Sequence, residues 1–416
     1  MGRKSLMTPL GVLDARALSR TPKRGMELVN LRELGIIPGV FGGDRGIHAQ
    51  GDIVTSTSDG VNLNDLWNAY QEGLTEANRL RDPVVALLTR RTTLESEPFF
   101  STGARAEFEE ASEYGEPVGH RPTQAHEFLG YTFKWYDLAA RFTWMYLANA
   151  PANQVDATAA MALEADNRNV FNLVMKTVFN NTRRTNEKGT TVYPWYAGVA
   201  GDLPPAVGST TFADSHNHFV TTGTATLTAA SVENLYDLIA EHGYKAALGY
   251  RHVLLVNKAE ADYMRNWRSA ANGGTSPATG GGLYDFVPAQ GTPSFLVPDN
   301  LRIENASQPP STYQGMTVVG QYGNWLVVEE EYIPAGYLVG FATGGPENVQ
   351  NPVVLREHPN ASLRGLRLVK GRTPDYPLID SFYNRGIGSG INTRGAGAVL
   401  QVDSGATYSV PAAYAW

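Results

Sequence analysis

The chain has 416 residues, of which 42% are hydrophobic and 18% charged, and its formal net charge is −7. This length fits two or three domains, or one domain with large insertions. The lack of cysteine excludes disulfides, cysteine–zinc sites and thiol catalysis, and no apolar run approaches the roughly 18 residues of a membrane span. Low charge together with 20 Tyr, 15 Phe and 7 Trp suits a protein that buries much of its surface against copies of itself.

The N-terminal segment is basic, although the whole chain is acidic. Residues 1–24 contain a single acid, Asp14, and six basic residues. These are Arg3, Lys4, Arg16, Arg20, Lys23 and Arg24. The segment has no apolar stretch typical of a secretory signal, so we expect synthesis in a cytoplasm. The glycine-punctuated residues that follow cannot bury a core and are expected to lie extended along another surface.

Two different patterns follow this arm. Apolar residues from Leu63 to Ala77 recur at three- and four-residue spacing, which predicts a helix that Asp82-Pro83 ends. Residues 104–146 then predict a long, highly charged β-hairpin whose turn is "EPVGHRPTQAH". An isolated two-stranded ribbon is only marginally stable in water, so this one is expected to lie against another surface.

Residues 156–181 give the longest helical pattern, with Asn153 as the predicted N-cap. About 26 residues at 1.5 Å each would span ~39 Å. A second helix is predicted after Thr228 and is expected to end at Gly243. A buried strand, "RHVLLVN", follows it, and then a third helix with a capping box formed by Asn257 and Glu260. The rest of the chain is mostly strands and turns.

The segment "FADSHNHF" contains a candidate metal motif. On a strand, Asp214, His216 and His218 would share one face, and carboxylate and imidazole groups bind divalent metals. The pattern resembles the short element of amidohydrolase-type barrels, but no apolar strand precedes it and no alternation of strands and helices follows. His242 is expected at a helix C-terminus, where a cation is favoured. We therefore expect a polar turn or strand edge without a metal, and keep a metal-dependent hydrolase as the alternative.

No other motif predicts catalysis. The glycine-rich "RGIGSGINTRG" follows no strand–helix unit that would bind a nucleotide, and the chain contains no Walker sequence and no H-E-x-x-H. Paired acids such as Glu109-Glu110 are too common to indicate a glycosidase. The sequence thus predicts neither an enzyme nor a cofactor.

The order of these elements resembles the major capsid protein family of tailed bacteriophages, which has the α+β Hong Kong 97-type fold. "FEEASEYGEP" and "FLGYTFKWYDLAARFTWMYL" resemble the arms of its E-loop, and "DATAAMALEADNRNVFNLVMKTVFNN" resembles its spine helix. "LYDLIAEHGY" with "HVLLVNKAEADYMRNW" is similar to its A-domain. The stretch from "NPVVLREHPN" to "AVLQV" is the most specific match, and is similar to capsid proteins of phages that infect actinobacteria.

The resemblance implies seven parts. These are an N-terminal arm (1–60), a first helix and connection to the P-domain (61–103), the E-loop hairpin (104–146), the P-domain spine helix (147–200), the A-domain (201–345), the P-domain return strands and loop (346–402) and a C-terminal tail (403–416). The region before the first helix is too short for the fused scaffold of some relatives, so a separate scaffold or none is expected.

The implied function is self-assembly into hexamers and pentamers of an icosahedral shell that encloses double-stranded DNA in the virion. The expected subunit contacts on the E-loop are Glu116, Arg121, His126, Lys134 and Arg141, and the expected interior or DNA-facing residues are Arg16, Arg20, Lys23 and Arg24. Portal, scaffold and decoration proteins are further candidate partners, and no membrane is involved. The founding member crosslinks subunits through Lys–Asn bonds, but no motif identifies a partner for Lys134. An encapsulin-type shell, which shares the fold and encloses cargo proteins, is the closest alternative.

Overall fold

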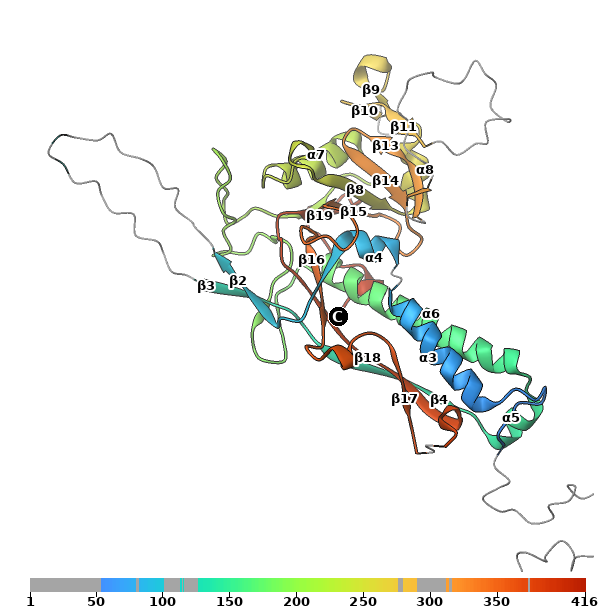
Figure 1. Cartoon of the computed structure of the whole chain (residues 1–416). Helices are drawn as coiled ribbons and strands as arrows, with labels where there is room; N and C mark the ends of the chain where they lie inside the picture. The colour runs from blue at the N-terminus through green and yellow to red at the C-terminus, as the bar shows by residue number, and fades with distance from the viewer. Residues whose placement is uncertain are drawn as a thin grey trace, which may run out of the picture.

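The computed structural model describes residues 54–79, 82–100, 113, 115, 126–275, 280–289, 312–313, 316–372 and 375–416. This part of the chain forms an eight-stranded sheet, a five-stranded sheet, three two-stranded ribbons and one long helix. Figure 1 shows the eight-stranded sheet at the top of the view and the five-stranded sheet with the long helix below it. The predicted α+β class is confirmed. The predicted arm residues Arg16, Arg20, Lys23 and Arg24 lie outside the described residues.

The first predicted helix is confirmed as α3 (Leu63–Arg79), which buries the apolar side chains that its spacing placed on one face. Asp82-Pro83 does more than end it, because it also starts α4 (Pro83–Leu88). The Asp82 carboxylate accepts hydrogen bonds from the backbone N–H groups of Val84 and Val85 at 2.9 and 3.2 Å. Proline at the first helical position loses no hydrogen bond, so this sequence suits a helix start.

The long helix is confirmed as α6 (Ala152–Phe179), 28 residues or ~42 Å at 1.5 Å each. Its predicted N-cap is wrong, because Pro151 holds the cap position in extended conformation without a side-chain hydrogen bond. Several positions of the N-terminal half are exposed, whereas most residues between Val170 and Phe179 are buried. A short helix, α5 (Trp144–Asn149), precedes it.

The five-stranded sheet is organised around β18. Its strands are β1 (Thr89–Thr92), β16 (Val353–Glu357), β18 (Asp380–Ile391), β17 (Arg367–Lys370) and β4 (Lys134–Arg141). One half of β18 pairs with β16, and the other half lies between β17 and β4. The predicted extent of the hairpin is therefore wrong, because its second arm leaves the hairpin and joins this sheet from Lys134 onward.

Glycines on β18 make this pairing possible. A Cβ at Gly388 would lie 1.5 Å from the Thr132 carbonyl oxygen, and one at Gly386 would lie 2.6 Å from the Trp135 ring. The segment that leads into β4 thus crosses β18 at backbone distance. The glycine-rich "RGIGSG" serves strand packing, which explains a motif that resembled a nucleotide loop.

The eight-stranded sheet carries two of the predicted helices. Its strands are β11 (Phe286–Pro288), β13 (Met316–Tyr322), β14 (Trp325–Glu329), β8 (Arg251–Val256), β15 (Tyr337–Thr343), β19 (Gly397–Gln401) and β7 (Phe219–Thr221), with β12 (Thr312–Tyr313) beside β13. The Thr228 cap of α7 (Ala229–Ala240) and the Asn257 cap of α8 (Lys258–Met264) are confirmed. Glu260 forms no predicted capping box, because its carboxylate accepts from the Gly336 N–H at 2.8 Å instead.

The segment after residue 346 closes both sheets. It supplies β16, β17 and β18 to one sheet and β19 to the other. One apolar cluster accordingly runs from Val174 and Phe179 on α6 through Val353 on β16 to Val399 on β19. The C-terminal residues also pack here, since the Tyr414 ring stacks on Phe179 with centroids 5.2 Å apart.

The short elements complete the chain. They are β2 (Ser96–Phe100), β3 (His126–Gly130), β5 (Arg184–Thr185), β6 (Thr191–Val192), β9 (Arg268–Ser269), β10 (Gly280–Gly282), and single 3-10 turns at Ala246–Leu248, Ala270–Asn272, Ala361–Leu363, Pro377–Ile379 and Ala412–Tyr414. Among the described helices, none combines the length and apolar character that crossing a membrane requires.

Candidate assembly surfaces and a buried histidine cluster

The hairpin of β2 and β3 projects from the body of the molecule (Figure 1). Its paired residues run from Ser96 with Gly130 at the base to Phe100 with His126. His126, a predicted subunit contact, is thus the first residue of β3, whereas Glu116 and Arg121 lie outside the described residues. An isolated hairpin of two five-residue strands is only marginally stable in water, so contacts with the body must stabilise this one.

Ion pairs hold the base of this hairpin on the body. The Arg90 guanidinium on β1 lies 2.5 Å from the Glu97 carboxylate on β2, with both side chains less than a fifth exposed. Arg356 on β16 donates to the Tyr131 carbonyl at 2.9 Å, directly after β3. The base of the hairpin is therefore fixed in orientation on the body of the molecule.

Strand β4 lies at an edge of the five-stranded sheet and is exposed on both faces. It pairs only with β18 among the described strands, and Ala140 is its only buried residue. Trp135 and Leu138, on opposite faces, are 44% and 47% exposed. Lys134 and Arg141 end the strand, and Arg141 donates to Asp380 at 2.9 Å. An edge strand with exposed apolar side chains is a ready pairing surface.

More large apolar side chains are exposed on the next two elements of the chain. Trp144 and Met145, at the start of α5, are 67% and 58% exposed, and Met161 on α6 is 60% exposed. Single exposed apolar residues are ordinary on protein surfaces, whereas a contiguous patch of them marks an interaction site.

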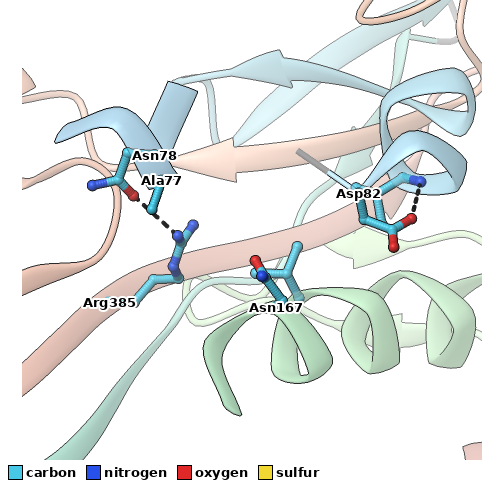
Figure 2. Close-up of a pocket in the computed structure, with 7 residues that line it drawn as sticks. Ala77, Asn78, Asp82, Asn167 and Arg385 are labelled. Carbon is cyan, nitrogen blue, oxygen red and sulfur yellow. Dashed lines mark hydrogen bonds between the residues drawn. The ribbon is translucent and has the colours of Figure 1, made fainter. Parts of the chain in front are cut away.

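A polar seam between α3, α6 and β18 forms the depression shown in Figure 2. Arg385 on β18 reaches toward α3, where it donates to the Asn78 side chain at 3.2 Å. Its guanidinium also pairs with Asp166 on α6 at 2.6 Å, and both side chains are less than a tenth exposed. Asn78 in turn binds both backbone groups of Leu366. These polar groups already bind one another, so the seam joins elements and offers no reactive group.

The histidine motif folds differently from the predicted strand face. Asp214 lies in a turn and accepts from the Gly201 N–H at 3.1 Å, apart from the two histidines. His216 and His218 are instead joined by His242, two residues beyond the end of α7. The three Nε2 atoms lie 2.9 to 3.0 Å from one another. The histidines are thus partners in a cluster that spans 26 residues of sequence.

Backbone pairing fixes the position of this cluster. The His218 N–H donates to the Tyr196 carbonyl at 2.7 Å, and the His218 carbonyl accepts from Val399 at 2.8 Å. The His218 side chain is fully buried, and its Nδ1 lies 2.7 Å from the Gly397 carbonyl oxygen. The prediction of a polar turn or strand edge therefore holds for Asp214 but is wrong for His218.

Burial keeps the imidazoles neutral. It lowers the pKa of His218 well below the usual value, and His242 lowers that pKa further. Burial, followed by the charge of His216, lowers the pKa of His242 to about 3, and burial also lowers the pKa of His216. Near neutral pH the cluster therefore carries three uncharged rings, each with one nitrogen that can act as a lone-pair donor.

A buried ion pair lies next to the cluster. Arg394 donates to both carboxylate oxygens of Asp202, at 2.6 and 2.5 Å, and its Nε donates to the Pro194 carbonyl at 2.9 Å. The guanidinium also covers the Tyr196 ring at 4.3 Å from the centroid, and that ring stacks on His242. The loop after β6 is thus held to the β18–β19 turn by charge and to the histidines by stacking.

The comparisons with known proteins include a strong likeness to a phage protein. A chain from Mycobacterium phage Patience is 38% identical and superposes with a TM-score of 0.67, covering 89% of this chain and 96% of that one. The mature capsid of bacteriophage PhiM1 is 9% identical, with 78% of this chain and 88% of that chain covered and a TM-score of 0.44. An encapsulin complex from Synechococcus elongatus is 12% identical, with 80% of this chain and 91% of that chain covered and a TM-score of 0.42. No family model matches the chain, and no curated protein matches it significantly.

Proposed function

The chain belongs to the major capsid protein family of tailed bacteriophages, and we propose that it assembles as hexamers and pentamers of an icosahedral shell around double-stranded DNA. In this proposal its role is assembly and involves no reaction. Assembly takes place in the cytoplasm of the host bacterium, and the product is the head of the virion. Portal, scaffold and decoration proteins would be further partners.

The observation that supports this proposal best is strand β4. Its residues are exposed on both faces, and its outer edge has no partner strand in the described part of the chain. A neighbouring subunit that covered Trp135 and Leu138 would remove apolar surface from water at roughly 25 cal/mol per Å². Lys134 and Arg141, together with the hairpin residues Glu116, Arg121 and His126, would contribute polar contacts at the rim of the same interface.

The basic arm supports the second part of the proposal. A shell that encloses DNA brings its inner surface close to phosphate charge, and lysine and arginine gain affinity there by releasing counterions. We assign Arg16, Arg20, Lys23 and Arg24 to contacts with the DNA backbone or with a neighbouring subunit on the inner side. Such contacts carry no sequence information, so DNA binding would be non-specific.

The test is assembly of the full-length chain, observed by negative-stain microscopy and sedimentation. Wild type is expected to form closed shells. Trp135→Ser combined with Leu138→Ser is expected to give a subunit with unchanged circular dichroism that no longer assembles, because both side chains are about half exposed in the isolated chain.

A substitution on the same strand serves as control. Ala139→Ser changes an exposed small residue of β4 and should leave assembly unchanged. Normal shells from the double variant would remove β4 from the subunit interface, and a wild-type chain that stays monomeric under all conditions would contradict the shell itself.

A further inference from the structure

We propose that His216, His218 and His242 form a binding site for a divalent transition metal of the zinc type. The three Nε2 atoms converge on one point, with separations of 3.0, 2.9 and 3.0 Å. The ligands come from a loop, from the residue before β7 and from the end of α7. The sequence favoured a site without a metal, and the convergence of His242 with His216 and His218 is the new observation behind this proposal.

Hydrogen bonding within the cluster cannot satisfy all three nitrogens. A neutral imidazole Nε2 is either a donor or an acceptor, so in a triangle at least one pair must be two donors or two acceptors. His218 is fixed as an acceptor, because its Nδ1 carries the proton that the Gly397 carbonyl accepts at 2.7 Å. A bound cation removes this conflict, since all three nitrogens can then present lone pairs to it.

The distances suit a metal of this class. Zinc binds imidazole nitrogen at about 2.0–2.1 Å, and tetrahedral angles then separate neighbouring nitrogens by about 3.3 Å. The observed separations are a few tenths of an ångström shorter, so small ring movements would accommodate the ion. Three imidazoles favour zinc, cobalt, nickel or copper, whereas magnesium and calcium prefer oxygen ligands.

The surrounding groups provide the outer support that a metal site requires. The hydrogen bond between His218 and the Gly397 carbonyl fixes the ring and its tautomer, as backbone carbonyls do for metal-bound histidines. The His242 ring lies between two aromatic rings, with Phe212 at 4.3 Å and Tyr196 at 5.5 Å between centroids. A Cβ at position 395 would lie 2.6 Å from the His242 ring, so Gly395 leaves room for it.

The charges nearby permit a cation. The Glu241 carboxylate lies 3.4 Å from His216 Nε2, on the more exposed side of the cluster, so a negative charge borders the site there. Arg394 is the neighbouring positive group, and its charge is matched by the two-point ion pair with Asp202. Three histidines supply three of the four ligands of tetrahedral zinc and leave the fourth position for water or another oxygen ligand.

Such a metal would hold two segments of the chain together. It would connect the residues that lead into β7 with the end of α7, and binding to the folded chain alone would stabilise the fold. This consequence does not depend on shell assembly, so it can be tested on the unassembled chain.

The experiment is titration of chelator-treated full-length protein with cobalt(II), followed by visible absorption, and elemental analysis after zinc loading. Wild type is expected to bind one ion per chain with the absorption of a four-coordinate site. His216→Gln changes the most exposed ligand and should lose this absorption, whereas His358→Gln, which lies against Phe133 and Trp135, should keep it. Zinc should raise the thermal unfolding midpoint of wild type and His358→Gln only.

Wild-type protein that binds no stoichiometric cobalt or zinc would overturn the proposal, and so would equal binding by His216→Gln. If His216→Gln does not fold, the wild-type titration decides alone, since its spectrum reports the coordination number directly.

Discussion

Removing the charge of Asp202 should destabilise the chain strongly, because it leaves a buried arginine without its counter-ion. The Asp202 and Arg394 side chains are 6% and 2% exposed, and two hydrogen bonds join them. Asp202→Asn keeps the shape and removes the charge. Asp202 has a second partner, Arg183, whose guanidinium lies 3.2 Å from the carboxylate. The Arg183 side chain is 37% exposed, so it can turn toward solvent when the charge of Asp202 is removed.

The free energy of unfolding is expected to fall by about 3–5 kcal/mol, the range found when one partner of a buried ion pair is removed. The size of this destabilisation should also depend on pH. Burial alone would raise the Asp202 pKa, but hydrogen bonds and charge from Arg394 and Arg183 outweigh it and lower the pKa below its usual value. The stabilisation is therefore fully present above the unfolded pKa of about 4 and is lost as pH falls through the lower folded pKa.

The assay is urea unfolding of the unassembled chain between pH 7 and pH 3, with Asp262→Asn as the matched control. Asp262 pairs with Lys258 and Arg265 at 3.1 and 3.2 Å but is 47% exposed, so its loss should cost less than about 1 kcal/mol. The difference between wild type and Asp202→Asn should narrow in acid. A cost as small as that of the control, or one that stays constant with pH, would refute the reasoning.

Two further substitutions test the packing of the spine helix and of β18, and a third serves as a control. Phe179→Ala removes a fully buried ring that stacks on Tyr414 and should cost about 3–5 kcal/mol in urea unfolding; a cost below 1 kcal/mol would mean that the C-terminal residues do not pack there. Gly388→Ala should abolish folded yield, because its Cβ would lie 1.5 Å from the Thr132 oxygen. Gly73→Ala, on the exposed face of α3, has free space and should stabilise the fold by about 0.5–1 kcal/mol. Normal yield of Gly388→Ala would show that the segment before β4 can move away from β18.

Local patterns in the sequence predicted the helices well, because each helix depends on neighbours within a few residues. The spacing of apolar residues identified α3 and α6, and the caps of α7 and α8 follow from Thr228 and Asn257. Asn153 failed as a cap because Pro151, with its fixed backbone angle, already starts the helix two residues earlier.

Strand partners could not be predicted in the same way. The segment from Lys134 to Arg141 has the composition of a hairpin arm, but its partner is β18, about 240 residues later. No residue within β4 specifies that partner. The signal lies on β18 itself, where glycines are required by the close approach of another backbone, and a sequence reading cannot tell which backbone approaches.

The histidine cluster shows the same limit for a candidate site. His216 and His218 are close in sequence, but the third member follows α7, and its position depends on how that helix packs on the eight-stranded sheet. Asp214 fits the motif better than His242 does, yet a turn directs its carboxylate to Gly201. The members of such a cluster are defined by convergence in space, so sequence spacing alone selected Asp214 in place of His242 as the third member. One feature of the sequence did point to His242 as a member of the cluster. His242 follows a predicted helix end, where the chain turns back toward the sheet that holds His218.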